Sequence, residues 1–276
     1  GSRLQGHGPQ EKRCAAYIEG LENAAGHEAR HTPLKNYCKG LLLPGERKSI
    51  EPMAARLDRV NVQAMRQSLH HLVAQAPWSD EILLGEVRAM RKQGPVVAWI
   101  VDDTGFPKKG THSVGVARQY CGQVGKQDNC RVAVSLSVAT WSSSLPIAYR
   151  LYLPKEWTED AERREKTEVP EEVVFQTKPE IALEQIRAAV ATNMDRGVVL
   201  PDAASGMNPD FRDGLTPLEP HYVVGVQSSM PVWVPCPQPL PAQRLGSLGR
   251  PSRWCNRSTA HTPSSVHYFA FIPPSP

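Results

Sequence analysis

The sequence lacks the features that mark several specialised classes of protein. It has no apolar run as long as a membrane span, and no signal peptide is recognisable at its start. Its six cysteines form no Cys-x-x-Cys pair, which argues against a zinc site and fits a reducing compartment. The chain begins with Gly1-Ser2 and has no initiator Met, so the sequence does not define the natural N-terminus.

What the sequence does contain is enough for a sizeable globular core. Its 276 residues, 40% of them hydrophobic, allow one large domain or two modest ones. The net charge of +4 is mildly basic, which is compatible with nucleic acid but is shared by many soluble proteins. Charge is unevenly distributed, because residues 231–276 contain ten of the 25 prolines and no Asp, Glu or Lys. Such proline density blocks helix and sheet interiors, so we expect a disordered end, with an extended basic strap charged by arginines as the alternative.

The first third of the chain divides into an irregular part and a helical part. Residues 1–40 are rich in Gly, His and charge, and they predict a polar, poorly packed arm with at most a short helix over residues 14–23. Residues 41–94 predict helices over 51–57, from 61 to about 76, and from 79 onward, each preceded by a polar capping residue. Two of them could form a helix-turn-helix, but by pattern alone an ordinary helical bundle with a solvated basic face is the preferred interpretation. Positive charge comes from Arg56, Arg59 and Arg66.

Beyond the helices, an apolar run over residues 96–101 predicts a buried strand that ends at Asp102 and Asp103. Carboxylates at a strand end can hold a divalent cation, and the nearby Lys108 and Lys109 can meet phosphate. By spacing alone, an Asp-rich turn that simply ends the strand is the preferred interpretation.

The rest of the pattern predicts a mixed α/β domain. We expect strands over 131–140 and 147–153, a charged surface segment over 154–170, and a helix over 179–194. A short strand over 198–200 leads to Asp202, which alone would be read as a helix cap or a turn. A helical turn over 209–213, a strand over 222–226 and an apolar strand over 266–272 complete the prediction.

Five blocks of this sequence, in this order, resemble bacterial insertion-sequence transposases of the DDE superfamily, nearest to the group numbered seven hundred and one. The resemblance extends from about residue 41 to about residue 234, and several blocks in fixed order make a specific signal. The blocks are VDDTGFPKKGTHSVGVARQYCGQVGKQDNC (101–130), LYLPKEWT (151–158), FQTKP (175–179), LPDAASG (200–206) and YVVGVQ (222–227).

The resemblance implies a ribonuclease H-like mixed sheet flanked by helices, the fold to which the order β-β-β-α-β-α-β corresponds. It divides the chain into an arm (1–40), a helical DNA-binding region (41–94), an incomplete catalytic core (95–230) and a tail that begins the family's insertion (231–276). Asp102 and Asp202 match the first two catalytic acids, and Asp103 is a lesser candidate ligand. Two Mg²⁺ or Mn²⁺ ions are implied as cofactors.

The implied partner is double-stranded DNA at transposon ends, with a second copy or an intact transposase as a further partner and no membrane. The implied location is the bacterial cytoplasm, at the nucleoid. Residues expected to contact DNA are basic side chains of the helical region and of the segment that follows the acids: Arg56, Arg59, Arg66, Lys108, Lys109, Arg118 and Lys126.

The third acid of the family has no counterpart in this chain. Only Asp210, Asp213 and Glu219 follow Asp202, and they come too early for that role. Pro201 and Ser205 also depart from the family pattern. We therefore expect a truncated or decayed transposase with impaired cleavage. A DNA-binding remnant without catalysis is one alternative, and an unrelated metal-dependent phosphohydrolase is another.

Overall fold

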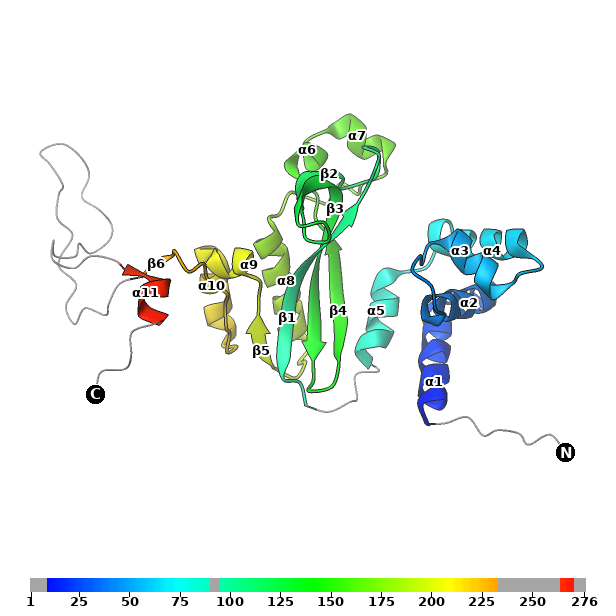
Figure 1. Ribbon diagram of the computed structural model, residues 1–276, viewed down its shortest axis with the longest axis horizontal. Coiled ribbons are helices and arrows are strands. Elements are labelled where there is room, and N and C mark those ends of the chain that lie inside the picture. Colours follow the sequence, from blue (N-terminus) through cyan, green and yellow to red (C-terminus); the bar gives the residue numbers. More distant parts are fainter. Residues whose placement is uncertain (1–8, 90–94, 233–263, 271–276) are drawn as a thin grey trace, which may run out of the picture.

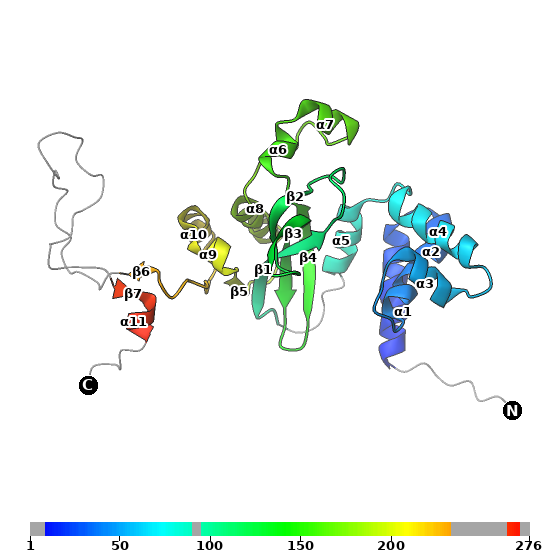
Figure 2. The ribbon, with the colours of Figure 1, turned by 45° about the horizontal axis from the view of Figure 1, so that its top comes forward.

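The structure, a computed structural model, describes residues 9–89, 95–232 and 264–270 (Figure 1). The N-terminal helices lie on one side of a central sheet, and the short helices that follow the last strand of this sheet lie on its other side (Figures 1 and 2). The expected mixed sheet, flanked by helices and preceded by a small helical region, is confirmed. Within the described ranges, none of the helices has an apolar stretch that could cross a bilayer.

The N-terminal region is helical from residue 9 onward, so the predicted irregular arm is wrong for residues 9–40. Ile18 and Leu21 are buried on one side of the first helix, and Gly40 allows close approach to Met53, since a Cβ there would lie 3.0 Å from the Met53 sulfur. Residues 1–8 of the predicted arm lie outside the described residues. The helices are α1 (Pro9–Ala24), the 3-10 helix η1 (Glu28–Arg30), α2 (His31–Leu42), α3 (Ile50–Leu57), α4 (Val62–Ala74) and α5 (Asp80–Ala89).

Helices α3 and α4 pack closely together, and each begins directly after the capping residue that the sequence predicted. Ser49 and Asn61 directly precede them, as the sequence indicated. The turn between the helices is held by Asp58, whose Oδ1 accepts hydrogen bonds from the backbone N–H groups of residues 60 and 61. Met53 and Leu69 are fully buried between the two helices. Apolar packing is sufficient to explain why α3 and α4 lie together. The role of these helices in DNA binding stays a prediction.

The central sheet contains β1 (Ala98–Pro107), β2 (Ala117–Cys121), β3 (Lys126–Ala139), β4 (Ser144–Leu151) and β5 (Val198–Leu200). Strand β3 pairs antiparallel with β1, β2 and β4, whereas β5 pairs parallel with β1. The prediction that the first strand ends at Asp102 is wrong, because β1 remains paired with β3 as far as Pro107. Strand β2 was not predicted. It forms a hairpin with β3, which therefore begins at Lys126 and not at the predicted residue 131.

One face of the sheet is covered by α8 (Lys178–Ala191), which follows the predicted helix closely. Ile181 and Ile186 of this helix are buried against the sheet, where Trp99 and Val101 of β1 are buried as well. The adjoining segment is largely exposed, as expected of a charged surface, and it forms α6 (Lys155–Thr158) and α7 (Ala161–Lys166), which were not predicted. Trp157 is fully buried there, and its Nε1 donates a 2.7 Å hydrogen bond to the carbonyl of Val116.

After β5 the chain forms α9 (Ala203–Met207), α10 (Pro209–Leu215) and the 3-10 helix η2 (Thr216–Leu218). The strand predicted over 222–226 is reduced to one parallel bridge, between Tyr222 and Val199. Farther on, β6 (Pro231–Val232) pairs with β7 (Ser264–Ser265), which leads into α11 (Val266–Ala270).

The strand predicted at the end of the chain is wrong for residues 266–270. The Ser265 hydroxyl accepts a hydrogen bond from the Tyr268 backbone N–H, so this serine starts a helix. Residues 271–272 of that predicted strand, and residues 233–263 of the predicted tail, lie outside the described residues.

Candidate active site

Asp102 and Asp103 are neighbours on β1, so their side chains leave opposite faces of the sheet. Asp103 follows Trp99 and Val101 on the face that is buried with α8, and it is half-buried. Asp102 lies on the other face and is exposed. Two acids that look equivalent in the sequence therefore have different surroundings.

Asp202 follows β5, the strand that pairs parallel with β1. Ala98 pairs with Val198 and Ile100 pairs with Leu200, so the register between the two parallel strands is a constant 100 residues (198 − 98 and 200 − 100). Asp102 and Asp202 each lie two residues beyond the last of these pairs, at the same end of the sheet. There the chain turns into α9, and Asp202 Oδ1 accepts a 2.8 Å hydrogen bond from the Ser205 backbone N–H.

The charges of both other aspartates act on Asp103. Burial raises the pKa of Asp103 above its ordinary value, and the negative charges of Asp202 and Asp102 raise it further. The ammonium group of Lys178 opposes this shift, since its Nζ lies 2.9 Å from Asp103 Oδ2. The pKa stays raised, so the ion pair does not fully offset burial and the nearby charges.

Lys178 is held in place by the start of α8. The Thr177 hydroxyl accepts a hydrogen bond from the Glu180 backbone N–H, and the Glu180 carboxylate accepts one of 2.7 Å from the Thr177 backbone N–H. This capping box fixes the first turn of the helix. The Lys178 Nζ also lies 5.6 Å from the centre of the Tyr152 ring. Sequence analysis gave this lysine no role, although it lies inside one of the quoted blocks.

The donor atoms at this site suit a hard divalent cation, because carboxylate oxygens are the ligands that Mg²⁺ prefers. These carboxylates do not form a complete metal-binding site, however. Across the described residues, no three His, Cys, Asp or Glu side chains are grouped closely enough to hold a metal ion. Asp210, Asp213 and Glu219 are all exposed, and none of them completes such a group.

Comparison with known families fits this geometry. The model of the DDE superfamily endonuclease family matches residues 20–270, which is most of the chain. The chain belongs to this family. It is also 30% identical, over 169 residues, to a probable transposase for insertion sequence element IS701 from Microchaete diplosiphon. The matched segment is 59% of this chain and 41% of that relative, so the chain spans about two fifths of the relative's length.

The basic residues predicted for the catalytic region of this DDE endonuclease family member lie on β2, β3 and the connection that follows β1. Lys108 and Lys109 follow the end of β1, and Arg118 and Lys126 are exposed on β2 and at the start of β3. Asn129 braces the connection, because its Nδ2 donates to the carbonyl oxygens of Lys108 and Gly110 at 2.7 and 2.9 Å. These residues lie beyond the acids along the direction of β1.

The basic residues predicted in the helical region lie apart from the acids, on the far side of α5 from the sheet (Figures 1 and 2). Arg56 is partly committed to structure, since its Nη2 donates a 2.8 Å hydrogen bond to the Arg47 carbonyl. Arg66 bonds through Nε to the Gln63 side chain, and Arg59 is exposed in the turn between α3 and α4. Structure therefore separates the predicted DNA-contacting residues into two groups.

Two cysteine thiols lie in the β2–β3 hairpin, one on each strand. Cys121 and Cys130 are both fully buried, and burial together with Cys121 raises the pKa of Cys130 to about 11. Gly105 of β1 contacts this pair closely, because a Cβ at that position would lie 2.8 Å from the Cys121 sulfur. The spacing of these cysteines in the sequence gave no sign that they would meet.

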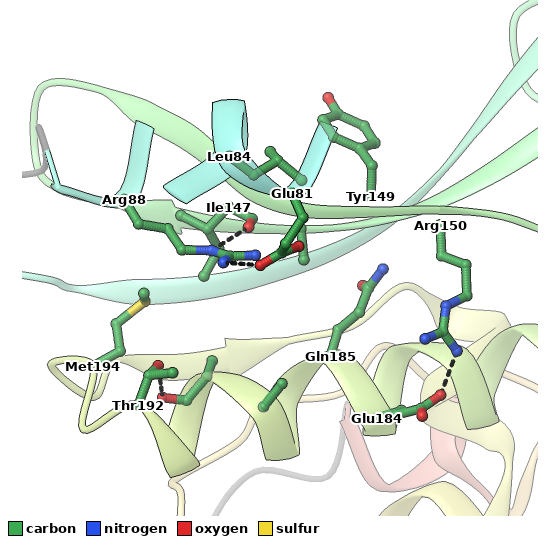
Figure 3. A pocket seen from close by; sticks show the side chains of 13 residues that line it. Glu81, Leu84, Arg88, Ile147, Tyr149, Arg150, Glu184, Gln185, Thr192 and Met194 are labelled. Atoms are coloured by element: carbon green, nitrogen blue, oxygen red, sulfur yellow. Dashed lines mark hydrogen bonds and ion pairs between the residues drawn. The ribbon is translucent and has the colours of Figure 1, made fainter. Parts of the chain in front are cut away.

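A cavity of about 300 Å³ lies between α5, β4 and α8, away from the acids (Figure 3). Arg88 crosses it, donating through Nε to the Ile147 carbonyl at 2.9 Å and pairing with Glu81 at 2.6 Å. None of the three aspartates lines this cavity. We interpret it as the seam where α5 covers the edge strand β4, and it is not part of the candidate site.

Proposed function

We propose that this chain carries a transposase-type site for DNA cleavage and strand transfer, in which Asp102 and Asp202 hold divalent ions. The observation that supports the proposal is the parallel pairing of β1 with β5, since Asp102 and Asp202 each follow the last paired residue of their strand by two positions. Family membership supports the assignment, since DDE endonucleases act on DNA. The proposed partner is double-stranded DNA at transposon ends, with a second copy or an intact transposase as a further partner.

In this mechanism the two aspartates present oxygen ligands from fixed backbone. Asp102 is held by the β1–β3 ladder, and the Ser135 hydroxyl donates a further hydrogen bond of 3.3 Å to its carbonyl. Asp202 is fixed by the first turn of α9. Two Mg²⁺ or Mn²⁺ ions would activate the attacking oxygen and neutralise the leaving one at phosphorus. Asp103, with its Lys178 partner, is the lesser candidate ligand.

DNA would be bound by basic groups on two separate parts of the chain. Lys108, Lys109, Arg118 and Lys126 would meet the phosphates next to the acids, while Arg56, Arg59 and Arg66 would meet a more distant stretch. Contacts of this kind are electrostatic, so we expect affinity for DNA to fall steeply as salt is raised.

A specific observation favours a weakly catalytic or non-catalytic form of this function. Asp210, Asp213 and Glu219 are the only carboxylate residues after Asp202 in these 276 residues, and none completes a metal site. With two firm ligands in place of the usual three acids, ions would be bound loosely. We therefore propose that this polypeptide by itself binds DNA and divalent ions but cleaves slowly.

The test combines three measurements on the full chain: Mn²⁺ binding, binding of duplex DNA at several salt concentrations, and nicking of supercoiled plasmid. We expect Asp102→Asn and Asp202→Asn to lose Mn²⁺ binding while keeping DNA binding, and we expect the wild type to nick slowly. Asp160→Asn is a matched control, because Asp160 likewise caps a helix, α7.

Robust nicking that disappears in Asp102→Asn would establish the transposase activity and refute the impairment. Mn²⁺ binding that ignores both substitutions would refute the site. Rapid hydrolysis of p-nitrophenyl phosphate without DNA affinity would instead support an unrelated phosphohydrolase.

A further inference from the structure

We propose that the cavity between α5, β4 and α8 is a binding site for a small neutral molecule with an apolar body and one N–H or O–H donor. The observation behind this proposal is Gln185, which lines the cavity and whose buried side-chain oxygen has no hydrogen-bond partner among the described residues. None of the three aspartates lines the cavity, so this proposal does not depend on the proposed function.

The orientation of the Gln185 amide is fixed by a neighbouring strand. Gln185 is only 8% exposed, and its Nε2 donates a 3.0 Å hydrogen bond to the Val134 carbonyl of β3. A carbonyl can only accept, so the amide nitrogen has to face Val134 and Oε1 is the acceptor that is left over. Burying an acceptor without a partner costs free energy, which a ligand that donates a hydrogen bond to Oε1 would recover.

The cavity has a buried apolar floor and an exposed polar rim (Figure 3). Ile147 and Ala189 are buried and form the floor, whereas Glu81, Tyr149 and Glu184 are exposed at the rim. The volume of about 300 Å³ is about twice that of an apolar cavity of about 150 Å³ that admits benzene. There is therefore room for a ligand with two fused rings.

The pairing of β4 with β3 shifts register at this cavity. Ala148 and Pro146 pair with consecutive residues of β3, so Ile147 between them is an extra residue of β4. Its carbonyl accepts the 2.9 Å hydrogen bond from Arg88 Nε of α5. A ligand in the cavity would thus contact a helix that is already attached to the edge strand, and it would find its walls in place.

The charges at the cavity are already paired, which favours a neutral ligand. Arg88 pairs with Glu81 at 2.6 Å, and Arg150 pairs with Glu184. These two ion pairs have no net charge, so a charged ligand would lose its hydration without gaining an unpaired counter-charge. The donor that Gln185 lacks is therefore best supplied by an uncharged N–H or O–H group.

Indole and benzofuran are suitable probes, because both are flat, neutral and bicyclic and only indole carries an N–H donor. Binding of each compound to the full chain is measured by ligand-observed nuclear magnetic resonance titration. We expect indole to bind one site with a Kd below about 1 mM. Benzofuran should bind about tenfold more weakly, the factor that corresponds to one net hydrogen bond.

Gln185→Met removes the acceptor and keeps an unbranched side chain of similar length, so the preference for indole should disappear. The matched control is Gln119→Met on β2. Gln119 also has a buried Oε1 without a partner, and its Nε2 donates to the Cys130 carbonyl at 3.1 Å, but it does not line the cavity. Its substitution should leave the preference for indole unchanged.

Ala188→Leu tests the location of the site by a second route. Ala188 lines the cavity and is exposed, so a larger side chain there occupies the cavity without disturbing the core. We expect this variant to lose binding of both probes. Circular dichroism melts check that each variant is folded, and Ala188→Leu decides the test if Gln185→Met is not.

Three results would overturn the proposal. Equal affinity of the wild type for indole and benzofuran would mean that the Gln185 oxygen selects nothing. Indole binding that persists in Ala188→Leu would place the probe elsewhere on the chain. Absence of saturable indole binding up to about 1 mM would mean that the cavity takes only solvent.

Discussion

Asp202 caps α9 and is also a proposed metal ligand, and a substitution that replaces one carboxylate oxygen by an amide nitrogen can separate these two roles. Its carboxylate caps α9 by accepting the 2.8 Å hydrogen bond from Ser205, and it is also a proposed metal ligand. Asp202→Asn keeps an acceptor for the cap but removes the negative charge, and Asn caps helices about as well as Asp. Asp202→Ala removes both. The two substitutions therefore distinguish a structural aspartate from one that binds metal.

We expect Asp202→Asn to change the free energy of unfolding by less than about 0.5 kcal/mol. Asp202→Ala should cost about 1 kcal/mol, which for a chain of this size lowers the melting temperature by roughly 2–4 °C. Both variants should lose at least about tenfold in Mn²⁺ affinity, because each removes one negative charge from the site. Thermal melts and Mn²⁺ titrations of the same samples provide the two readouts.

Asp160 supplies a matched control, since it caps α7 by accepting a 2.9 Å hydrogen bond from the Arg163 backbone N–H. Its Asn and Ala variants should repeat the stability pattern and leave Mn²⁺ affinity unchanged. The reasoning is refuted if Asp202→Asn binds Mn²⁺ as tightly as the wild type. In that case the residue is a helix cap and nothing more.

Two further predictions concern the sheet behind the acids. Gly105→Ala places a Cβ 2.8 Å from the Cys121 sulfur, so we expect the free energy of unfolding, measured in urea, to fall by about 1–3 kcal/mol. Gly110→Ala is the control, because a Cβ there meets no atom within 4 Å and should leave the free energy of unfolding unchanged. Equal effects of the two substitutions would contradict the packing. Cys130 has its pKa raised to about 11 from 9.0, so the folded state holds its proton more tightly and stability should fall as pH rises from 9 to 11. At pH 8, iodoacetamide should modify Cys130 far more slowly in the folded chain than in urea, and similar rates would contradict its burial.

Elements with strong local signals could be predicted from the sequence. Helix α8 combines Thr177 and Glu180 as a capping box with inward apolar residues at helical spacing, so both its start and its buried face were recognisable. The same holds for α4, which begins directly after Asn61. In these segments, information within one or two helical turns is sufficient.

Elements that depend on distant partners could not be predicted in the same way. Strand β1 continues beyond Asp103 because β3, some thirty residues later, pairs with it as far as Pro107. Polar residues of β2 form a strand only because Lys126 to Cys130 lie opposite them. At the other extreme, residues 266–270 are apolar enough for a strand, but they form a helix that begins after Ser265, whose hydroxyl accepts a hydrogen bond from the Tyr268 backbone N–H.

The twin aspartates show most clearly what register adds to sequence. Asp102 and Asp103 have the same side chain and adjacent positions, so no local pattern can give them different roles. Successive side chains on a strand alternate between faces, so burial of Trp99 and Val101 toward α8 places Asp103 on the same side. There Lys178, at the start of α8, is its only ion-pair partner among the described residues. Asp102 is left exposed and free of ion pairs among those residues, and like Asp202 it lies two residues beyond the last pair between β1 and β5. A one-residue slip of β1 would exchange the two acids, and the lysine would then neutralise the proposed ligand instead of its neighbour.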